Sequence, residues 1–524
     1  MKKKSLSKLL ALGMAAVMTA GMLAGCGSDK GGSDSAPANE GASQPADSGT
    51  EEKTPEETGN ADAEKEDAGT EDAGTASGEV PTLVWWTVGG TPADDFEEAV
   101  AQISDYTEEK IGVRLDVKIA GWNDYDSKMN TIVNAGEYFD IMFTNNTNYS
   151  KFVNLGAFEN ISDLVQSAAP ELYSFVPEKL WSGVQIHGNV YAVPTYKDSS
   201  LTQFYYFDDQ YVQKYNVDMG TVKDMASIDP IVRAMKEGEG KSFYPIKLNQ
   251  GALWNGFFNE YDGLASGIQA IGVKIDDAER KVVCTLEQED ILANLELLHA
   301  WYADGIINPD ANVVSEDSKG NAFGNAQGWP SAVAQWQILQ GVEKYDAAKV
   351  FGPLYTTETI QGSMNAISVN SNYKEEALKV LELMNTDSKF RDMCAYGVEG
   401  NHFEYLDDGT VKRLRDDWTW PAYTQGTFFI MSNQEGADPN QWDEVKKQNE
   451  EATASTCLGF ALDVSNIQNE VSNVNTVWDK YKFDMLTGAS DPATAVPKCV
   501  EELKAAGLDT IITEAQKQID EFFK

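Results

Sequence analysis

The sequence predicts an α/β protein folded into two lobes, and two observations support this prediction. First, residues 81–524 comprise 444 residues, more than one compact hydrophobic core usually holds. Second, apolar runs alternate with amphipathic segments between residues 83 and 146, so we expect strands and helices to follow one another. Strand–helix–strand units of this kind build parallel sheets with right-handed crossovers.

Five elements at the start of the folded part can be placed from their residue patterns. The apolar patterns predict strands over 83–88, 113–119 and 138–146, and helices over 91–109 and 121–136. In the first helix we expect Thr91 to act as the cap, Pro92 to occupy the first helical position and Asp94 to complete a capping box. Each helix is expected to pack on the sheet through its apolar face.

The carboxyl ends of the three predicted strands carry aromatic and amide residues. Ligands of parallel sheets bind at the carboxyl ends of the strands. Trp86 lies near the end of the first predicted strand, Trp122 follows the second, and Asn145 lies at the end of the third. We therefore expect these three residues to bind the ligand.

The first 25 residues have the pattern of an export signal. Four lysines precede an uncharged, mainly apolar run over 9–25. This run is near the lower length limit for crossing a bilayer, so a permanent transmembrane helix is the weaker interpretation. The run ends in Leu23-Ala24-Gly25-Cys26, which resembles the lipobox of bacterial lipoproteins. That resemblance implies that residues 1–25 are a signal peptide and that Cys26 is acylated, which would anchor the protein in the cell membrane.

The acylated Cys26 and an acidic tether would make up residues 26–80. From Gly27 to Val80 the chain has 15 acidic residues against 3 lysines, and Val80 is the only large apolar residue. Such a segment cannot bury enough apolar surface to offset its conformational entropy, so we expect it to be disordered. Flexible-chain statistics give these 54 residues a span of roughly 40 Å. The folded part would then be held on the extracytoplasmic side of the membrane.

The folded part is strongly acidic. It keeps a net charge of −34 when the signal and the tether are subtracted from the −42 of the whole chain. A nucleic acid would meet no basic surface, and an anionic ligand would be repelled on approach. We therefore expect no nucleic-acid partner and a neutral or cationic ligand.

No motif in the sequence calls for an enzyme, a metal or a cofactor. The three histidines lie outside any H-E-x-x-H pattern, and no G-x-S-x-G pattern is present. The carboxylate pairs Asp208/Asp209 and Asp416/Asp417 are adjacent residues whose side chains point apart, unlike the facing acid and base of a glycosidase. The four cysteines after Cys26 are far apart, which excludes a zinc site and leaves one or two disulfides or buried free thiols.

Residues 181–217 contain two motifs in a characteristic order. Gly188-Asn189-Val190-Tyr191-Ala192-Val193-Pro194 is followed by Phe204-Tyr205-Tyr206-Phe207-Asp208-Asp209. This order resembles the crossover of extracellular solute-binding proteins of ABC importers, of the carbohydrate-binding type. The segments 328–336, 350–384 and 472–511 resemble later parts of the same family in the same order, and 395–409 resembles a marker of a long-chain subgroup.

The resemblance implies a two-lobed periplasmic-binding-protein-like fold of the class II type, with a cleft between the lobes, crossover strands and extra C-terminal helices. The first lobe would comprise 81–198 and 362–410, and the second lobe 199–361 and 411–524. A ligand would bind between open lobes, closure would bury it, and the closed form would dock on the transmembrane subunits of an ABC permease. We expect a monomer that catalyses no reaction and needs no cofactor.

Saccharides suit the aromatic and polar residues of this chain. Sugar rings offer apolar faces that stack on aromatic side chains, and hydroxyls that pair with amides and carboxylates. Three further tryptophans lie in loop-like contexts, and two residues lie at the first crossover: Trp254, Trp329, Trp336, Tyr196 and Asp198. We expect these five residues to join the three at the strand ends in binding an oligosaccharide. For each tryptophan, the alternative is a place in the hydrophobic core.

Two other functions remain open. A binder of peptides or of other small polar or cationic solutes could use the same fold, because an acidic, aromatic site suits cations. A tethered glycan-degrading enzyme would need two facing carboxylates, and the sequence gives no sign of them.

Overall fold

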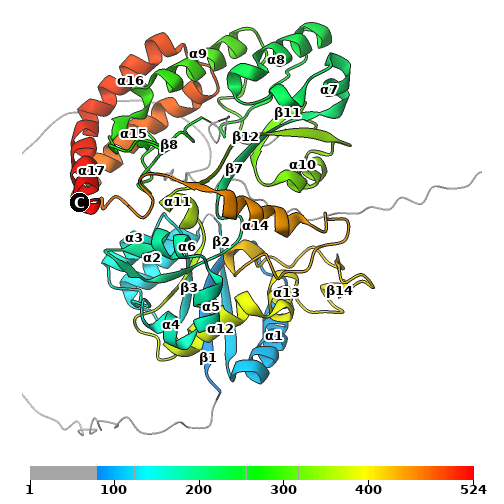
Figure 1. Cartoon of the computed structure of the whole chain (residues 1–524), viewed down its shortest axis with the longest axis vertical. Coiled ribbons are helices and arrows are strands. Elements are labelled where there is room, and N and C mark those ends of the chain that lie inside the picture. The colour runs from blue at the N-terminus through cyan, green and yellow to red at the C-terminus, as the bar shows by residue number, and fades with distance from the viewer. Residues whose placement is uncertain (1–79, 123, 252, 254–256, 317) are drawn as a thin grey trace, which may run out of the picture. The chain divides into compact units, whose positions relative to one another are not determined.

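The computed structural model describes residues 80–524 apart from positions 123, 252, 254–256 and 317. The expected acylation residue Cys26 and the expected ligand-binding residue Trp254 therefore lie outside the described residues, as do the signal peptide and all of the tether before Val80. Residues 80–524 belong to one compact unit that contains two large hydrophobic cores. These cores correspond to two lobes, the first carrying β1 and the second carrying the C-terminal helices (Figure 1).

The first lobe is built on a five-stranded mixed sheet of order β2-β1-β3-β13-β6. Its strands are β1 (Thr82–Gly89), β2 (Arg114–Gly121), β3 (Ile141–Thr144), β6 (Ala192–Pro194) and β13 (Met364–Ile367). β1 is parallel to β2 and β3, whereas β13 is antiparallel to both β3 and β6. The three predicted strands and their parallel arrangement are confirmed. The carboxyl ends of β1, β2, β3 and β6 therefore lie at one edge of the sheet, which we call the carboxyl edge.

Helices surround the sheet of the first lobe. They are α1 (Phe96–Ile111), α2 (Tyr125–Ala135), α3 (Tyr149–Asn154), α4 (Leu164–Ala168), α5 (Pro170–Phe175), α6 (Glu178–Gly183), α12 (Lys374–Thr386) and α13 (Ser388–Tyr396). As predicted, α1 buries Phe96, Val100 and Ile103. Small two-stranded sheets join β4 (Gln185–Ile186) to β5 (Asn189–Val190) and β14 (Phe403–Tyr405) to β15 (Val411–Arg413).

The predicted capping of α1 is wrong. The helix begins at Phe96 rather than near Pro92, and no side chain caps it. The residues that precede the helix do not cap it; they contact residues 415–419, which are distant in sequence. The backbone carbonyl of Thr91 accepts a hydrogen bond from the Thr419 hydroxyl at 3.2 Å, and the Asp95 carboxylate is paired with Arg415.

The second lobe contains a four-stranded sheet of order β11-β7-β12-β16 and a three-stranded sheet of order β10-β9-β8. The strands are β7 (Leu201–Asp208), β8 (Tyr261–Asp262), β9 (Ile271–Lys274), β10 (Val283–Cys284), β11 (Phe323–Gln327), β12 (Tyr345–Tyr355) and β16 (Thr453–Ala454). β7 lies between β11 and β12 and is antiparallel to both. The aromatic run of the crossover motif therefore forms a central strand of the second lobe.

Helices also surround the second lobe. They are α7 (Asp209–Tyr215), α8 (Met225–Glu239), α9 (Glu289–Ala303), α10 (Val333–Gln340), α14 (Gln441–Glu451), α15 (Gln468–Leu486), α16 (Pro492–Ala506) and α17 (Leu508–Phe522). The last three contact one another, and both α15 and α16 also contact α9. Short 3-10 turns occur at Met219–Thr221, Thr285–Glu287, Pro330–Ala332 and Ala422–Thr424.

The chain passes from the first core to the second after β6 and returns between β12 and β13. The short helix α11 (Thr357–Ile360) lies in the returning segment. Trp418 and Trp420 still belong to the core of the first lobe. The predicted start of the last part of the second lobe at residue 411 is therefore too early, because these two tryptophans pack on β1 and α1.

The structure also bears on disulfide bonds and on membrane-spanning helices. Within the described residues all four cysteines are buried free thiols, so the disulfide alternative does not hold there. Across residues 80–524, excluding the six undescribed positions, no helix combines the length and the apolar character needed to cross a bilayer.

Candidate functional site

A partly exposed aromatic pair, Trp122 and Tyr423, marks the carboxyl edge of the first lobe. Trp122 directly follows β2 and keeps 50% of its surface exposed. Its ring is stacked on that of Tyr423, with the ring centroids 5.9 Å apart and the planes 23° from parallel. Exposed tryptophans are unusual, because burying a large aromatic side chain is favourable. The pair therefore presents an apolar platform at the position where ligands of such sheets bind.

Tyr423 reaches this edge because residues 418–424 lie across the ends of the strands. A side chain at Gly89, the last residue of β1, would lie 2.5 Å from the Thr419 carbonyl oxygen, so the two backbones are in close contact. Thr87 donates a hydrogen bond to the Thr424 hydroxyl at 3.2 Å. The amide of Asn365 on β13 donates to the Thr424 carbonyl at 2.9 Å. The segment is thus fixed to two strands of the sheet.

A lysine and an aspartate follow β6 at the same edge. The Lys197 ammonium lies 2.8 Å from the Asp198 carboxylate and 5.9 Å from the centroid of the Tyr423 ring. Asp198 is only 6% exposed, and the Asn449 side chain of α14 donates a hydrogen bond to the Lys197 carbonyl. The predicted residue Asp198 therefore lies near the platform, with its charge paired with Lys197.

Tyr196 is packed rather than presented to solvent. It is 5% exposed, and its ring centroid lies 4.6 Å from that of Phe429 and 5.6 Å from that of Phe175. Burial raises the pKa of the Tyr196 phenol. Its structural surroundings are those of a core residue at the start of the crossover.

Asn145 and its neighbour Asn146 have different partners. The Asn145 side chain accepts a hydrogen bond from the backbone N–H of Thr147 at 3.0 Å, which closes a local turn. The amide of Asn146 donates to Oε1 of Glu358 at 3.3 Å. Glu358 lies on α11, in the segment that returns from the second lobe. The side chain that reaches across is therefore that of Asn146, one residue after the predicted one.

Glu358 also lies next to an acidic residue of the second lobe. A side chain at Gly263 would lie 3.5 Å from Oε2 of Glu358, which places this carboxylate beside the Asp262–Gly263 peptide. Burial, and secondarily the charge of Asp262, raises the pKa of Glu358 to about 7. Burial likewise raises the pKa of Asp262, which is 1% exposed and has Oδ2 without a hydrogen-bond partner. Glu358 is therefore a titratable group in contact with both lobes.

The remaining predicted tryptophans lie in different places. Trp86 is half-buried on β1, and the Lys128 ammonium of α2 lies 4.4 Å from the centroid of its ring. Trp329 and Trp336 are 4% and 7% exposed and belong to a small aromatic cluster of the second lobe. Of the predicted residues, the structure therefore places Trp122 in the platform and Asp198 close to it. Trp86, Trp329 and Trp336 pack against neighbouring elements instead.

The candidate binding residues named from the sequence do not include Tyr423, Asn146, Lys197 or Glu358. Tyr423 follows Trp418-Thr419-Trp420-Pro421, a dense aromatic run with a proline but without helical or strand periodicity. Such a run indicates an ordered loop, and this signal could have identified Tyr423 as a candidate residue. Glu358 carries no comparable signal, because its importance comes from Asp262 and Asn146, which are distant in sequence.

The arrangement is suited to binding. The platform offers an apolar face, while Lys197 and the Asn146 amide are donors and Glu358 is an acceptor that carries a proton part of the time near neutral pH. These are the groups that recognise sugar hydroxyls and ring faces. In the part of the chain that the structure describes, no group of three or more His, Cys, Asp or Glu residues is arranged to hold a metal ion.

The two-lobed fold is that of a solute-binding protein, and comparison with known proteins shows the family. The model of the bacterial extracellular solute-binding protein family matches residues 101–400, which is more than half of the chain. The chain therefore belongs to this family. Residues 456–524 match a second model, a domain of unknown function (DUF3502).

A curated relative and two solved structures are similar over most of the chain. A carbohydrate ABC transporter substrate-binding protein of Streptococcus pneumoniae is 27% identical over 471 residues, covering 86% of this chain and 92% of the relative. The crystal structure of the N-glycan transport solute-binding protein NgtS of the same species is 25% identical, with a TM-score of 0.75, covering 84% of this chain and 99% of that one. NgtS in complex with Man5GlcNAc gives 26% identity and a TM-score of 0.63, with coverage of 84% and 98%.

Proposed function

We propose that this protein is the substrate-binding component of an ABC importer and that it captures an oligosaccharide. The observation that carries the proposal is the Trp122–Tyr423 platform at the carboxyl edge of the first lobe, where the Trp122 ring is half exposed and Tyr423 is partly buried. The similarity to a carbohydrate ABC transporter substrate-binding protein, and to NgtS with a bound glycan, supports an oligosaccharide over a peptide.

The mechanism is capture between the two lobes followed by delivery. One sugar ring stacks on Trp122 while its hydroxyls bond to Asn146, Glu358 and Lys197. Glu358 contacts residues of both lobes, so it is positioned to respond when the lobes close on the ligand. A ligand that binds the closed form more tightly shifts the population toward it. The closed form then docks on the transmembrane subunits of the permease and releases its ligand unchanged.

The protein would act on the extracytoplasmic face of the cell membrane. The lipobox-like Leu23-Ala24-Gly25-Cys26 supports acylation of Cys26, and the acidic tether of residues 27–80 supports a flexible link to the lipid. Metabolic labelling with a palmitate analogue would test this part, with Cys26→Ser as the control that should lose the label and leave the membrane fraction.

The saccharide assignment is tested by thermal unfolding of the full chain in detergent. Ligands that bind only the folded form raise its Tm, so Man1GlcNAc and Man5GlcNAc, the glycans named for NgtS, should be included with neutral milk oligosaccharides, dipeptides and polyamines. We expect a neutral oligosaccharide to raise the Tm and to be recovered intact by mass spectrometry. A rise with peptides or polyamines alone would refute the saccharide assignment, and a cleaved glycan would refute a pure binding role.

A further inference from the structure

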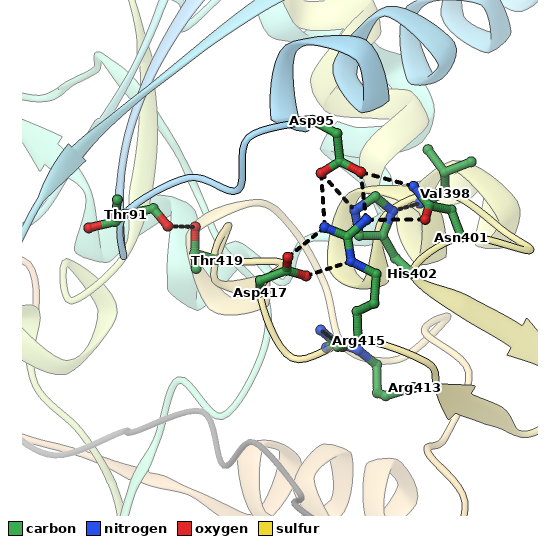
Figure 2. Close-up of polar contacts among 9 residues, drawn as sticks. All are labelled: Thr91, Asp95, Val398, Asn401, His402, Arg413, Arg415, Asp417 and Thr419. Atoms are coloured by element: carbon green, nitrogen blue, oxygen red, sulfur yellow. Dashed lines mark hydrogen bonds and ion pairs between the residues drawn. The ribbon is translucent and has the colours of Figure 1, made fainter.

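Two arginines hold the segment that carries Tyr423, one at each end. The outer arginine is Arg415, whose guanidinium pairs with Asp95 through Nη1–Oδ2 at 2.5 Å and Nη2–Oδ1 at 3.1 Å (Figure 2). The same guanidinium bonds to both carboxylate oxygens of Asp417, through Nε at 3.0 Å and through Nη2. Arg415 therefore fixes Asp417 to residues that follow β1.

A buried histidine lies beside this outer contact. Nδ1 of His402 accepts a hydrogen bond from the Val398 backbone at 3.1 Å, so the ring proton is on Nε2, which lies 3.7 Å from Oδ1 of Asp95 (Figure 2). His402 is fully buried, and its ring lies 5.0 Å from that of Trp418. Hydrogen bonds from Arg415 and Asn401 hold the pKa of Asp95 well below its usual range. Asp95 is thus a permanent anion at the centre of the cluster.

The inner arginine is Arg391 on α13, which is completely buried. Its guanidinium donates to the carbonyls of Thr427 at 2.6 Å and Ala422 at 2.8 Å, and to Oε1 of Gln425 at 2.6 Å. These partners lie on both sides of Tyr423, so residues 422–427 wrap around the guanidinium. Burying a charge without a carboxylate partner is costly and lowers the pKa of Arg391 to about 10. The desolvation cost of the buried Arg391 charge therefore falls at the turn that carries Tyr423.

From these contacts we propose that Arg391 and Arg415 are positioning residues that hold Tyr423 against Trp122 and so form the ligand platform. The hydrogen bonds of Arg391 fix the turn around Tyr423 directly. Arg415 acts from the other end, through Asp417 and the anchored residues Trp418 to Trp420. Neither arginine touches the ligand; a rigid turn keeps the tyrosine ring in place, which reduces the ordering cost of binding.

The test measures the ¹⁹F chemical shift of Trp122 in the ligand-free protein, which reports whether its ring is stacked on Tyr423. The full chain is labelled with 5-fluorotryptophan, and the ¹⁹F line of Trp122 is assigned as the one lost in Trp122→Phe. Tyr423→Leu removes the stacked ring and defines the chemical shift of an unstacked Trp122. We expect Arg391→Lys and Arg415→Gln to move the Trp122 line toward the Tyr423→Leu position, the first further than the second. Lysine keeps the charge of Arg391 but cannot make its three divergent hydrogen bonds.

Arg114→Gln is a matched control. Like Arg415, Arg114 pairs with two acidic residues and its side chain is 31% exposed, but it lies at the amino end of β2. Its loss should leave the Trp122 line in place. The proposal is overturned if the line stays at the wild-type position in both Arg391→Lys and Arg415→Gln, or if Arg114→Gln moves it equally. If Arg391→Lys fails to fold, Arg415→Gln and its control decide alone.

A second measurement, of glycan affinity, rests on the proposed function. For a glycan that binds the wild type, Arg415→Gln should weaken the affinity several-fold and Arg114→Gln should leave it unchanged. If no glycan binds the wild type, the proposed function fails while the ¹⁹F arm still decides the role of the arginines. A moved Trp122 line with unchanged affinity would mean that the arginines position a surface that the ligand does not use, and the proposal would be overturned.

Discussion

The platform of the first lobe and the aromatic cluster of the second lobe are built from the same residue types in opposite surroundings. Trp122 and Tyr423 lie at the end of a sheet with Trp122 half exposed, whereas Trp336 is 7% exposed and stacked on Tyr206 at 5.0 Å. In sequence, Trp122 directly follows Gly121, whereas Trp336 lies eight residues after Gly328. At Gly328 a side chain would lie 2.9 Å from the Trp336 ring, so this glycine makes room for packing rather than forming an open loop. A side chain at Gly121 would meet no atom closer than 3.9 Å, so the elements packed around each ring, and not a neighbouring glycine, decide whether the ring is covered.

Removing Trp336 should have the greatest effect on stability. Trp336→Ala should lower the free energy of unfolding by about 3–5 kcal/mol, because it opens a cavity beneath α10. Trp122→Ala should change it by no more than about 0.5 kcal/mol, since half of that side chain is already in water. Urea unfolding of both variants measures the difference. Equal losses would mean that the two rings do not differ in structural role.

A second prediction concerns Glu358, where residues of the two lobes meet. Its pKa is about 7 in the folded protein against an ordinary value of 4.5, so the folded form holds this proton more tightly. The stability it contributes is present below pH 4.5 and is lost as the pH rises through 7. At pH 8, Glu358→Gln should therefore be more stable than the wild type by about 3 kcal/mol.

Unfolding curves between pH 4 and pH 8 would measure this effect. Glu279, an exposed glutamate of the second lobe, supplies the control, since Glu279→Gln should leave the shape of the pH profile unchanged. A Glu358→Gln profile parallel to that of the wild type would contradict the assignment of a raised pKa to this carboxyl.

The third prediction concerns the contact between Trp122 and the ligand. Trp122→Ala should weaken oligosaccharide binding by about tenfold, equivalent to about 1.4 kcal/mol, because the stacking face is lost. Calorimetric titration of the full chain measures the affinity, with Trp181→Phe as the control on a buried ring of the first lobe. Unchanged affinity in Trp122→Ala would place the ligand away from the platform.

The smallest expected effect concerns Trp86. Its ring is half-buried and lies under the Lys128 ammonium, so Lys128→Ala should cost about 0.5–1 kcal/mol of stability through the lost cation–π contact. Saccharide affinity should stay within twofold of the wild type. A larger loss of affinity would return Trp86 to the ligand-binding residues.

The part of the fold that depends on local pattern could be predicted from the sequence. The three parallel strands follow from apolar runs, and the order of the crossover motifs indicated both lobes. The cap of α1 could not be predicted, because Asp95 pairs with Arg415, some 320 residues away. Tyr423 and Glu358 could not be predicted for a similar reason, because the residues around them come from remote parts of the chain. Trp122 could be named as a candidate because it directly follows a predicted strand.

The central claim is that the ligand binds at the platform of the first lobe, and ¹⁹F titration tests it most directly. The 5-fluorotryptophan-labelled chain would be titrated with the saccharide that raises its Tm, with the lines of Trp122, Trp329 and Trp336 assigned by substitution. We predict that the Trp122 line moves in a saturable manner and that the lines of Trp329 and Trp336 move far less. Saturable movement of Trp329 or Trp336 with a stationary Trp122 would contradict the account.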